Sequence, residues 1–373
     1  MRIADVRIRV LEAPITDAIS LSFGVLQVRR MGLVEIESDS GSIGYGESWL
    51  NFPPWAWRER KATVDQGIAP LLRGEQLDSV HRLVSLLHSR LDGYGRQWGA
   101  KGPIYQAISG IEIALWDLLG KERHASLHEL LGGSLRSRIP LYASGLEPSN
   151  VVDLSTRCVA EGFSGIKLRV GFGDQTDLAS VDQASAVLRD SGQLYLDANQ
   201  AWSLEQAIHL LQRLAIGQIA WVEEPVCGNA VDELGRLYEK TGVPVAVGEN
   251  FYGLAEFMPY MRSDAVAVLQ PDVSKVGGII EMSRICLKAD AYHKVVTPHW
   301  YGGAIALAAT LHTAAVHPIV DQVEFDVRTN PFRDSLVTPG LDAVEGTIRV
   351  PDGPGLGVEP DPAAIHEYEV DDV

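Results

Sequence analysis

Three short apolar runs, each ending in an acidic residue, constrain this chain more than any other feature. The acids are Asp197, Glu223 and Glu249, and the two intervals are equal (223 − 197 = 26 and 249 − 223 = 26). A parallel strand, its loops and a returning helix need about that length, because a parallel crossover takes a dozen residues or more. We therefore expect three neighbouring parallel strands that each present one carboxylate at the same rim. Several oxygen ligands at one rim are typical of a site for a hard divalent cation.

The same alternation of strand and helix extends through the middle of the chain. The strand-like runs recur at nearly constant spacing, and each of the first seven is followed by a helical pattern. Such alternation predicts an α/β fold of the (β/α)8, TIM-type barrel class. The predicted strands are Ile139–Ala143, Gly165–Arg169, Gln193–Asp197, Ile219–Glu223, Val243–Gly248, Ala265–Leu269, Lys294–Thr297 and Val320–Phe325.

The chain before and after the predicted barrel has a different pattern. Residues 1–50 alternate like an antiparallel meander, with a polar loop expected from about Ile15 to Val28, and residues 59–134 show helical spacing. Beyond residue 327 the chain is rich in Pro and Gly, as in turns and loops. We expect an N-terminal α+β capping domain at 1–134, a catalytic barrel at 135–327, and a C-terminal tail at 328–373 that returns to the capping domain.

Composition excludes some classes of partner. The formal net charge of −17 argues against nucleic acid, whose phosphates favour a basic surface. The N-terminal residues alternate like a strand and unlike a signal peptide, and no run reaches the roughly 18 apolar residues of a membrane span. Three scattered cysteines, Cys158, Cys227 and Cys286, fit a reducing compartment. We expect a soluble cytoplasmic protein without nucleic-acid or membrane partners.

Ionisable side chains follow almost every predicted strand. In a barrel of this class the carboxyl ends of the strands form the active site. A lone acid there is more often a helix cap, but several acids at one rim repel each other unless a cation lies among them. The pattern indicates an acidic centre flanked by groups that carry positive charge or transfer protons. In strand order the candidates are Lys167 and Arg169, Asp197 and Asn199, Glu223, Glu249, Asp272, His299 with Trp300, and Glu324.

Taken together, these motifs resemble the enolase superfamily, in its mandelate racemase subgroup, over essentially the whole chain. The resemblance implies Mg²⁺ held by Asp197, Glu223 and Glu249, and abstraction of the proton alpha to a carboxylate through an enediolate. Members of this family are often homo-oligomers. The resemblance carries these further roles: a hydrogen bond from Asp272 to His299, a hydrogen bond from Glu324 as an acid to the substrate carboxylate, and substrate contacts from Asn199 and Trp300.

One position departs from the family pattern. Members that use a base on the second barrel strand usually have Lys where this chain has Arg169, and a guanidinium is a poor base because it stays protonated. We therefore expect His299 to act as the base, or as both base and acid, while Lys167 and Arg169 hold negative charge. Such one-sided chemistry suits β-elimination of a hydroxyl or opening of a lactone. Lys275 is either a charge beside this site or part of a surface salt bridge.

The tail resembles those of sugar-acid dehydratases and galactarolactone cycloisomerases in this subgroup. The expected function is dehydration of a sugar acid or cycloisomerisation of its lactone, with a small-molecule carboxylate as substrate. A racemase or epimerase of a hydroxy acid on the same scaffold is the alternative, and a non-catalytic binding barrel is a remote one. A metal-dependent hydrolase is a further possibility, but this chain lacks the His-rich ligand set on the early strands that such an enzyme uses. The aromatic loop Trp49–Trp57 either forms a substrate wall or packs between the domains.

Overall fold

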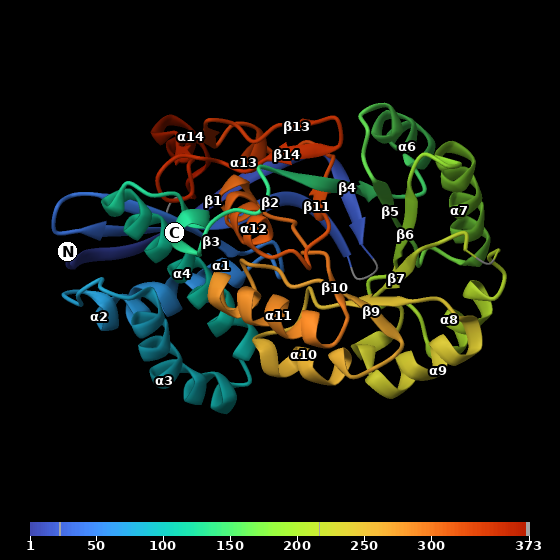
Figure 1. Cartoon of the computed structure of the whole chain (residues 1–373), viewed down its shortest axis with the longest axis horizontal. Coiled ribbons are helices and arrows are strands. Elements are labelled where there is room, and N and C mark those ends of the chain that lie inside the picture. Colours follow the sequence, from blue (N-terminus) through green and yellow to red (C-terminus); the bar gives the residue numbers. More distant parts are fainter. Residues whose placement is uncertain (22–23, 216, 371–373) are drawn as a thin grey trace.

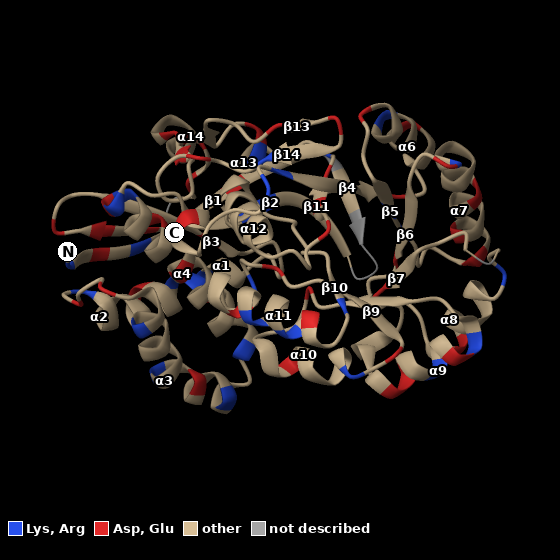
Figure 2. Ribbon diagram, viewed as in Figure 1, with Lys and Arg blue, Asp and Glu red and all other residues tan. Residues whose placement is uncertain are grey.

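The computed structural model describes residues 1–21, 24–215 and 217–370. An N-terminal antiparallel sheet with its helices lies on one side of the molecule, and a large, mainly parallel sheet with surrounding helices lies on the other (Figure 1). Within the described chain, no helix combines the length and the apolar character needed to cross a membrane. Acidic and basic residues are interspersed along outer helices such as α3 (Val80–Trp98) and α9 (Val231–Thr241) (Figure 2).

The N-terminal sheet is a three-stranded antiparallel meander, as its alternating sequence predicts. Its strands are β1 (Ile3–Leu21), β2 (Gly24–Ser38) and β3 (Ile43–Trp49), in that order. The expected polar loop from Ile15 to Val28 is wrong, because β1 and β2 extend through it and, after an irregularity between Pro14 and Ile19, pair again from Ile19–Leu26 to Leu21–Gly24. Ile19 and Leu26 are buried in one cluster with Tyr301, and this apolar contact keeps both strands extended. Phe23, expected in that loop, lies outside the described residues.

Helices pack on this sheet and lead to the second half of the chain. The longest is α4 (Lys101–Arg123), and almost all of its residues from Ile104 to Gly120 are buried. It is covered by β2 and β3 on one side and by α3 and α11 (Ile279–Ala291) on others. A helix that is apolar on most faces needs such complete cover. The helices of this region are α1 (Ala56–Ala62), the π-helix η1 (Thr63–Ile68), α2 (Ala69–Leu72), α3, α4 (Lys101–Arg123) and α5 (Leu127–Leu130).

All eight strands expected from the alternating pattern are present, in one sheet and in parallel. The order is β11-β4-β5-β6-β7-β8-β9-β10, so each strand lies beside its neighbour in sequence, and β11 joins the first strand. Their bounds are β4 (Arg138–Leu146), β5 (Gly165–Arg169), β6 (Gln193–Asp197), β7 (Trp221–Glu223), β8 (Val245–Val247), β9 (Val266–Leu269), β10 (Val295–Val296) and β11 (Val323–Asp326).

A helix follows each of the first seven of these strands, as predicted, and the helices cover the outer face of the sheet (Figure 1). After β11 there is only the short α13 (Pro331–Asp334). The covering helices are α6 (Val151–Ala160), α7 (Asp174–Leu188), α8 (Leu204–Leu211), α9, α10 (Leu254–Met261), α11 (Ile279–Ala291) and α12 (Ala304–Val316), and a 3₁₀ turn, η2 (Cys227–Asn229), precedes α9.

The tail contacts both halves of the molecule. Strand β14 (Thr347–Arg349) extends the large sheet antiparallel to β4, while Leu356 N donates to Asp117 Oδ1 of α4 at 2.8 Å. Near the end of the chain, Glu369 forms an ion pair of 2.8 Å with Arg9 of β1. The elements of the tail are β12 (Val337–Thr338), β13 (Ala343–Val344), β14 (Thr347–Arg349), β15 (Glu359–Pro360) and α14 (Pro362–Tyr368).

Side chains alternate between the two faces of the parallel strands, and this positions the site. On β5, Leu168 packs in the main core, whereas Lys167 and Arg169 face a cavity. Lys167 pairs in register with Tyr195, which belongs to a separate buried cluster with Tyr142 and Trp221 on the inner face. The inner aromatic side chains therefore support Lys167 from the side away from the rim.

Candidate active site

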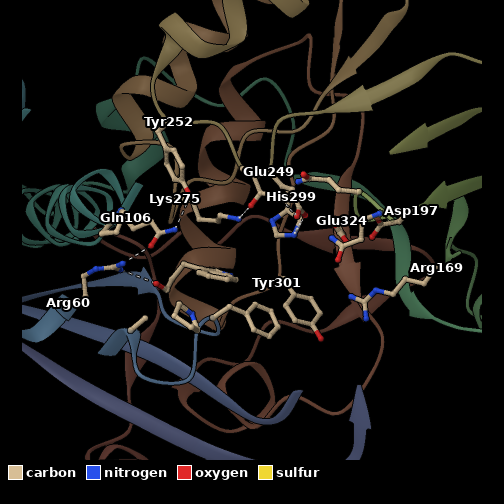
Figure 3. A pocket seen from close by; sticks show the side chains of 18 of the residues that line it. Arg60, Gln106, Arg169, Asp197, Glu249, Tyr252, Lys275, His299, Tyr301 and Glu324 are labelled. Carbon is tan, nitrogen blue, oxygen red and sulfur yellow. Dashed lines mark hydrogen bonds and ion pairs between the residues drawn. The ribbon is translucent and has the colours of Figure 1, made fainter. Parts of the chain in front are cut away.

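A cavity of about 690 Å³ lies over the carboxyl ends of the parallel strands and under the N-terminal helices. Figure 3 shows Arg169, Asp197 and Glu324 at one end, Glu249 and His299 in the middle, and Arg60 and Gln106 at the other end. Seven residues predicted for the site line this cavity: Lys167, Arg169, Asp197, Asn199, Glu249, His299 and Glu324. These residues lie on or directly after five strands, β5, β6, β8, β10 and β11, and they meet where the sequence predicts.

Lys167 lies at the centre of a buried cluster of carboxylates. Its Nζ is 2.8 Å from Glu223 Oε2, 2.9 Å from Glu324 Oε1 and 4.0 Å from Asp197 Oδ2. Asp197 and Glu223 are register partners on β6 and β7, so neighbouring parallel strands place both acids side by side. Gln270 Nε2 also donates to Glu223 Oε2 at 2.7 Å, which fixes that carboxylate.

His299 is held on the other side of the same cluster. Its Nδ1 is 2.7 Å from Asp272 Oδ2, and its Nε2 is 2.9 Å from Glu249 Oε2. The other Asp272 oxygen accepts from the backbone N and the Oγ of Ser274, at 2.8 and 2.6 Å. Because a carboxylate can only accept, Nδ1 of His299 is the donor of their hydrogen bond, and Nε2 is the ring nitrogen that faces Glu249 and the cavity.

The net effect of burial and neighbouring charges is to raise the pKa values of three of these groups, His299, Lys167 and Glu223. Burial by itself lowers the pKa of His299, but the carboxylates of Glu249 and Glu324 outweigh it, and the pKa is raised well above the usual value. Burial likewise opposes the charge of Lys167, and its acidic neighbours raise its pKa well above the usual value. The pKa of Glu223 is raised well above its usual range, first by burial and then by the like charges of the other acids. A negative field of this kind favours a bound cation.

Three of these acids suit a hard divalent cation by their chemistry. Asp197, Glu223 and Glu249 come from neighbouring strands, and Glu223 Oε1 is buried without a hydrogen-bond partner among the described residues. In this structure Glu223 faces Lys167 and Glu249 faces His299. Within residues 1–21, 24–215 and 217–370, no group of three His, Cys, Asp or Glu side chains is close enough together to hold a metal ion. An all-oxygen set with one unsatisfied buried oxygen fits Mg²⁺ in its donor chemistry.

The backbone at Gly248 aims Glu249 at the cavity. Gly248 has φ +141°, and a Cβ there would lie 2.7 Å from the Phe257 ring and 2.8 Å from Gln270 N. Only glycine fits such a conformation and such close contact. The following residue, Asn250, donates to Glu249 Oε1 at 3.0 Å and to both oxygens of Glu224 at 3.1 Å. The turn therefore orients one cavity carboxylate and anchors it to a second, buried one.

A second cationic group lies at the Arg169 end. Arg169 and Arg29 of β2 stand near the ring of Tyr301, with guanidinium carbons 5.8 and 4.8 Å from the ring centroid. Arg29 also forms a buried ion pair with Asp326 at the end of β11. The N-terminal hairpin is thereby tied to the rim of the parallel sheet beside Arg169.

The structure corrects one predicted contact and adds others. Trp300 does not reach the cavity, because it is 1% exposed, stacks on Phe325 and donates its indole N–H to Gly303 O at 3.1 Å. Its neighbour Tyr301 lines the cavity instead. Lys275 is buried and lines the cavity, so the surface salt bridge is excluded.

Part of the aromatic loop forms a cavity wall, through Trp49, Phe52 and Pro53, while Trp55 is exposed. Sequence reasoning missed the remaining lining residues from the N-terminal helices, chiefly Arg60 and Gln106. A polar residue directly before the apolar run of helix α4 was the available signal for Gln106.

Comparison with known proteins places the whole chain in one family. The family model described as "Mandelate racemase / muconate lactonizing enzyme, N-terminal domain" matches residues 3–132. The model described as "Enolase C-terminal domain-like" matches residues 150–364. Between them the two models account for most of the chain.

Individual relatives are similar over nearly their full length. D-galactarolactone cycloisomerase of Agrobacterium fabrum is 33% identical, with 100% of each chain covered. Arabinonate dehydratase of Saccharolobus solfataricus is 32% identical, with 90% of this chain and 89% of the relative covered. The crystal structure of a racemase from Streptomyces coelicolor A3(2) with bound magnesium superposes with a TM-score of 0.88 at 26% identity, covering 99% of this chain and 100% of that one.

Proposed function

The chain belongs to the mandelate racemase subgroup of the enolase superfamily, and on that premise we propose that it removes the proton alpha to a carboxylate of a sugar acid or its lactone. The reaction that follows is loss of water or opening of the lactone ring. The observation that carries this proposal is the placement of His299, whose Nε2 faces a buried carboxylate cluster that contains Lys167. The names of the relatives, a lactone cycloisomerase and a sugar-acid dehydratase, support the same two outcomes.

The proposal includes a closed (β/α)8 barrel as the scaffold. Val296 of β10 forms a parallel bridge with Val320, and Glu324 N donates to Pro298 O at 3.2 Å, so the last two strands of the sheet are joined at their rims. We accordingly divide the chain into a capping region at 1–134, a barrel at 135–327 and a tail at 328–373. This division puts the cap over the strand ends, where substrate would be enclosed.

In the proposed reaction His299 takes the α-proton at Nε2 in its neutral form. That form would be favoured once Glu249 binds Mg²⁺, because the cation would offset the carboxylate charge that raises the pKa of His299. Asp272 holds the imidazole by its Nδ1 and stabilises the imidazolium that forms. Lys167 and Arg169 hold the negative charge that develops on the substrate carboxylate, and Glu324 hydrogen-bonds that carboxylate as an acid. Asn199 contacts the substrate at the same rim. Mg²⁺, held by Asp197, Glu223 and Glu249, would supply further positive charge to the dianionic enediolate.

The second half of the reaction differs for the two substrates. In a dehydration the electron pair left at the α-carbon forms the double bond, the β-carbon–oxygen bond breaks, and the imidazolium of His299 returns the proton to the departing hydroxyl. In a lactone the ring oxygen departs as a carboxylate and needs no proton. His299 alone can therefore serve as base and acid, and Arg169 keeps its charge throughout because guanidinium does not act as a base near neutral pH.

The test is incubation with sugar acids and their lactones in D₂O with Mg²⁺, followed by NMR and mass spectrometry. We expect a dehydrated or ring-opened product that carries deuterium. The alternative is a racemase or epimerase, for which the similarity to a structurally known racemase is the supporting observation. Recovery of substrate with inverted configuration, and of no dehydrated or ring-opened product, would favour that alternative and reject the lyase or cycloisomerase reaction.

A further inference from the structure

The end of the cavity away from Arg169 is lined by hydrogen-bond donors whose arrangement no part of the proposed chemistry uses. Figure 3 shows Arg60, Gln106, Tyr252 and Lys275 grouped there, on the far side of His299 from Arg169. Arg60 and Gln106 come from helices α1 and α4 of the N-terminal region, while Tyr252 and Lys275 follow strands β8 and β9. The group therefore joins both halves of the molecule across one end of the cavity.

The orientation of the Gln106 side chain follows from its partner. Arg60 Nη2 donates to Gln106 Oε1 at 2.5 Å, and arginine has no acceptor atom, so the amide oxygen must face Arg60. The amide nitrogen is then turned the other way, where it lies 3.4 Å from the hydroxyl of Tyr252. Gln106 is 7% exposed and lines the cavity, so its NH₂ group is presented as a fixed donor.

Lys275 adds a buried positive charge beside this amide. Its Nζ donates to the neutral oxygen Oδ1 of Asn250 at 2.9 Å and lies 4.6 Å from the centroid of the Trp49 ring. The loop that carries Lys275 also carries Asp272, the partner of His299, so the ammonium is placed as rigidly as the proposed base. Both ends of this loop are thus fixed relative to the reacting centre.

Two buried donors at this end, Trp49 Nε1 and Arg60 Nε, have no acceptor among the described residues. Arg60 is 1% exposed, and burial, only partly offset by Glu59, lowers its pKa to about 10. Glu59 Oε2 lies 3.7 Å from Arg60 Nε, beyond hydrogen-bond distance, and Glu59 Oε1 accepts from Thr63 Oγ1 at 2.6 Å. A buried cation with mostly neutral partners favours an anionic ligand nearby.

Tyr252 is built into this end of the cavity. Lys101 Nζ donates to Tyr252 O at 2.7 Å, and Tyr252 N donates to Glu256 Oε2 at 2.7 Å, so its backbone is held on both sides. The ring lies where a Cβ on Gly102 of α4 would stand 2.8 Å away, and only glycine leaves room for it. The hydroxyl is thereby brought to the Gln106 amide.

From this arrangement we propose that Lys275, the Gln106 amide and the Tyr252 hydroxyl form a subsite for a second carboxylate of the substrate. The preferred substrate is then a dicarboxylic sugar acid or its lactone, bound with the reacting carboxylate near Lys167 and the distal one at the cap. Arg60 is a positioning residue, because it orients Gln106 and adds positive charge. This inference rests on the proposed function, since it names the substrate class for that reaction.

The experiment compares pairs of acids that differ only at the far end. Six-carbon aldaric acids, aldonic acids of the same configuration and the lactones of both are assayed with Mg²⁺ for α-proton exchange and product formation. We expect kcat/KM for the best aldaric compound to exceed that for its aldonic partner by at least about tenfold, since hydrogen bonds to a charged group stabilise by roughly 1.5–3 kcal/mol. Exchange with no member of any pair rejects the proposed function and this inference together. Exchange with equal or better use of the aldonic acids rejects the inference alone.

Two variants test whether the preference for aldaric over aldonic acids arises from the proposed subsite. Gln106→Glu replaces the donor with a carboxylate that can still pair with Arg60, so the fold is kept while the distal anion is repelled. We expect it to reduce the aldaric-to-aldonic ratio of kcat/KM by about 10- to 100-fold, mainly through KM, and Lys275→Met to reduce it in the same direction. The matched control is Arg58→Gln, an exposed residue on the same helix as Arg60, which should leave the ratio unchanged.

A binding measurement separates recognition from turnover. Calorimetric titration of galactarate and galactonate into each protein with Mg²⁺ should show tighter binding of galactarate to the unmodified protein, and loss of that difference in Gln106→Glu. Thermal unfolding of each variant confirms that it is folded. An unchanged ratio and unchanged relative affinities in folded Gln106→Glu and Lys275→Met would overturn the proposal.

Discussion

His299 Nδ1 lies 2.7 Å from Asp272 Oδ2, and both side chains are less than 10% exposed. The acid fixes the imidazole in the orientation that leaves Nε2 toward the cavity. Burial alone lowers the pKa of His299, but Glu249 and Glu324 reverse this effect and raise it. In this pair Asp272 orients the imidazole, and His299 presents the nitrogen proposed to take the proton.

The first prediction follows from that unit. His299→Asn keeps a side chain of similar polarity and removes the proposed base, so exchange of the substrate α-proton with D₂O should be abolished. Exchange is measured by proton NMR of recovered substrate. Asp272→Asn should retain some exchange but reduce kcat by roughly 10²-fold or more, because general acid–base catalysis contributes on that scale. If His299→Asn still exchanges the proton, the base lies elsewhere, and Lys167 is the next residue to change.

The second prediction concerns the metal. Mg²⁺ binds the folded carboxylate set and not the unfolded chain, so it should raise the thermal midpoint of the protein. At a concentration 100 times Kd the stabilisation is about 2.7 kcal/mol. Removal with EDTA should reverse the shift, and Glu223→Gln should diminish it. Asp232→Asn, on the exposed side of helix α9, serves as the control. An equal shift in Glu223→Gln would argue against this residue as a ligand.

The third prediction is a pH effect on stability from Glu112. This buried residue of α4 accepts from Ile280 N at 2.8 Å and Trp116 Nε1 at 3.0 Å, and burial raises its pKa to about 8. The carboxyl of Glu112 therefore binds its proton more tightly in the folded protein than in the unfolded chain. The stability that this difference contributes is complete below pH 4.5 and is lost as pH rises toward 8. Glu112→Gln mimics the protonated form.

Urea unfolding between pH 4.5 and 9 provides the measurement for Glu112. The free energy of unfolding of Glu112→Gln should approach that of the unmodified protein at the acidic end. Toward pH 8 the free energy of unfolding of Glu112→Gln should increasingly exceed that of the unmodified protein. The excess is at most about 5 kcal/mol, from the difference of 3.5 between the ordinary pKa of 4.5 and the raised pKa of about 8. A difference between the two proteins that does not vary with pH would show that Glu112 keeps an ordinary pKa.

The fourth prediction has the opposite sign and concerns His312 of α12. Its Nε2 donates to Leu356 O at 3.0 Å in the tail, and burial lowers its pKa to about 4. The unfolded chain then binds a proton that the folded chain rejects, so stability is complete above pH 6.5 and declines as pH falls toward 4. His312→Gln should flatten this decline, which amounts to at most about 3 kcal/mol.

Limited proteolysis offers a second readout for His312. Cleavage within the tail should accelerate below pH 5 in the unmodified protein. Protonation puts a charge on the buried His312 ring and a proton on its Nδ1, which accepts from His128 N at 3.2 Å. The same acceleration should be weaker in His312→Gln. Equal acid sensitivity of both proteins in unfolding and in proteolysis would contradict the assignment of this pH dependence to His312.

The strands and the rim acids could be predicted because their signals are local. The apolar runs that end at Asp197, Glu223 and Glu249 indicate, within a few residues, where each strand lies, where it ends and which face its side chains occupy. Parallel connections then place the three strand ends together. The hairpin of β1 and β2 could not be predicted in full, because Ile19 and Leu26 stay in strands through contact with Tyr301, far away in the sequence.

By itself the sequence determined the parallel α/β architecture, the order of its strands and the set of charged residues at one rim. Tertiary structure alone decided that Trp300 is buried while Tyr301 faces the cavity, and that Arg60 turns the amide of Gln106 toward Tyr252. The physical reason is the distance along the sequence between the residues that interact. Periodicity and strand ends are encoded by neighbouring residues, whereas the wall of the cavity is formed by helices and loops that meet only when the chain is packed.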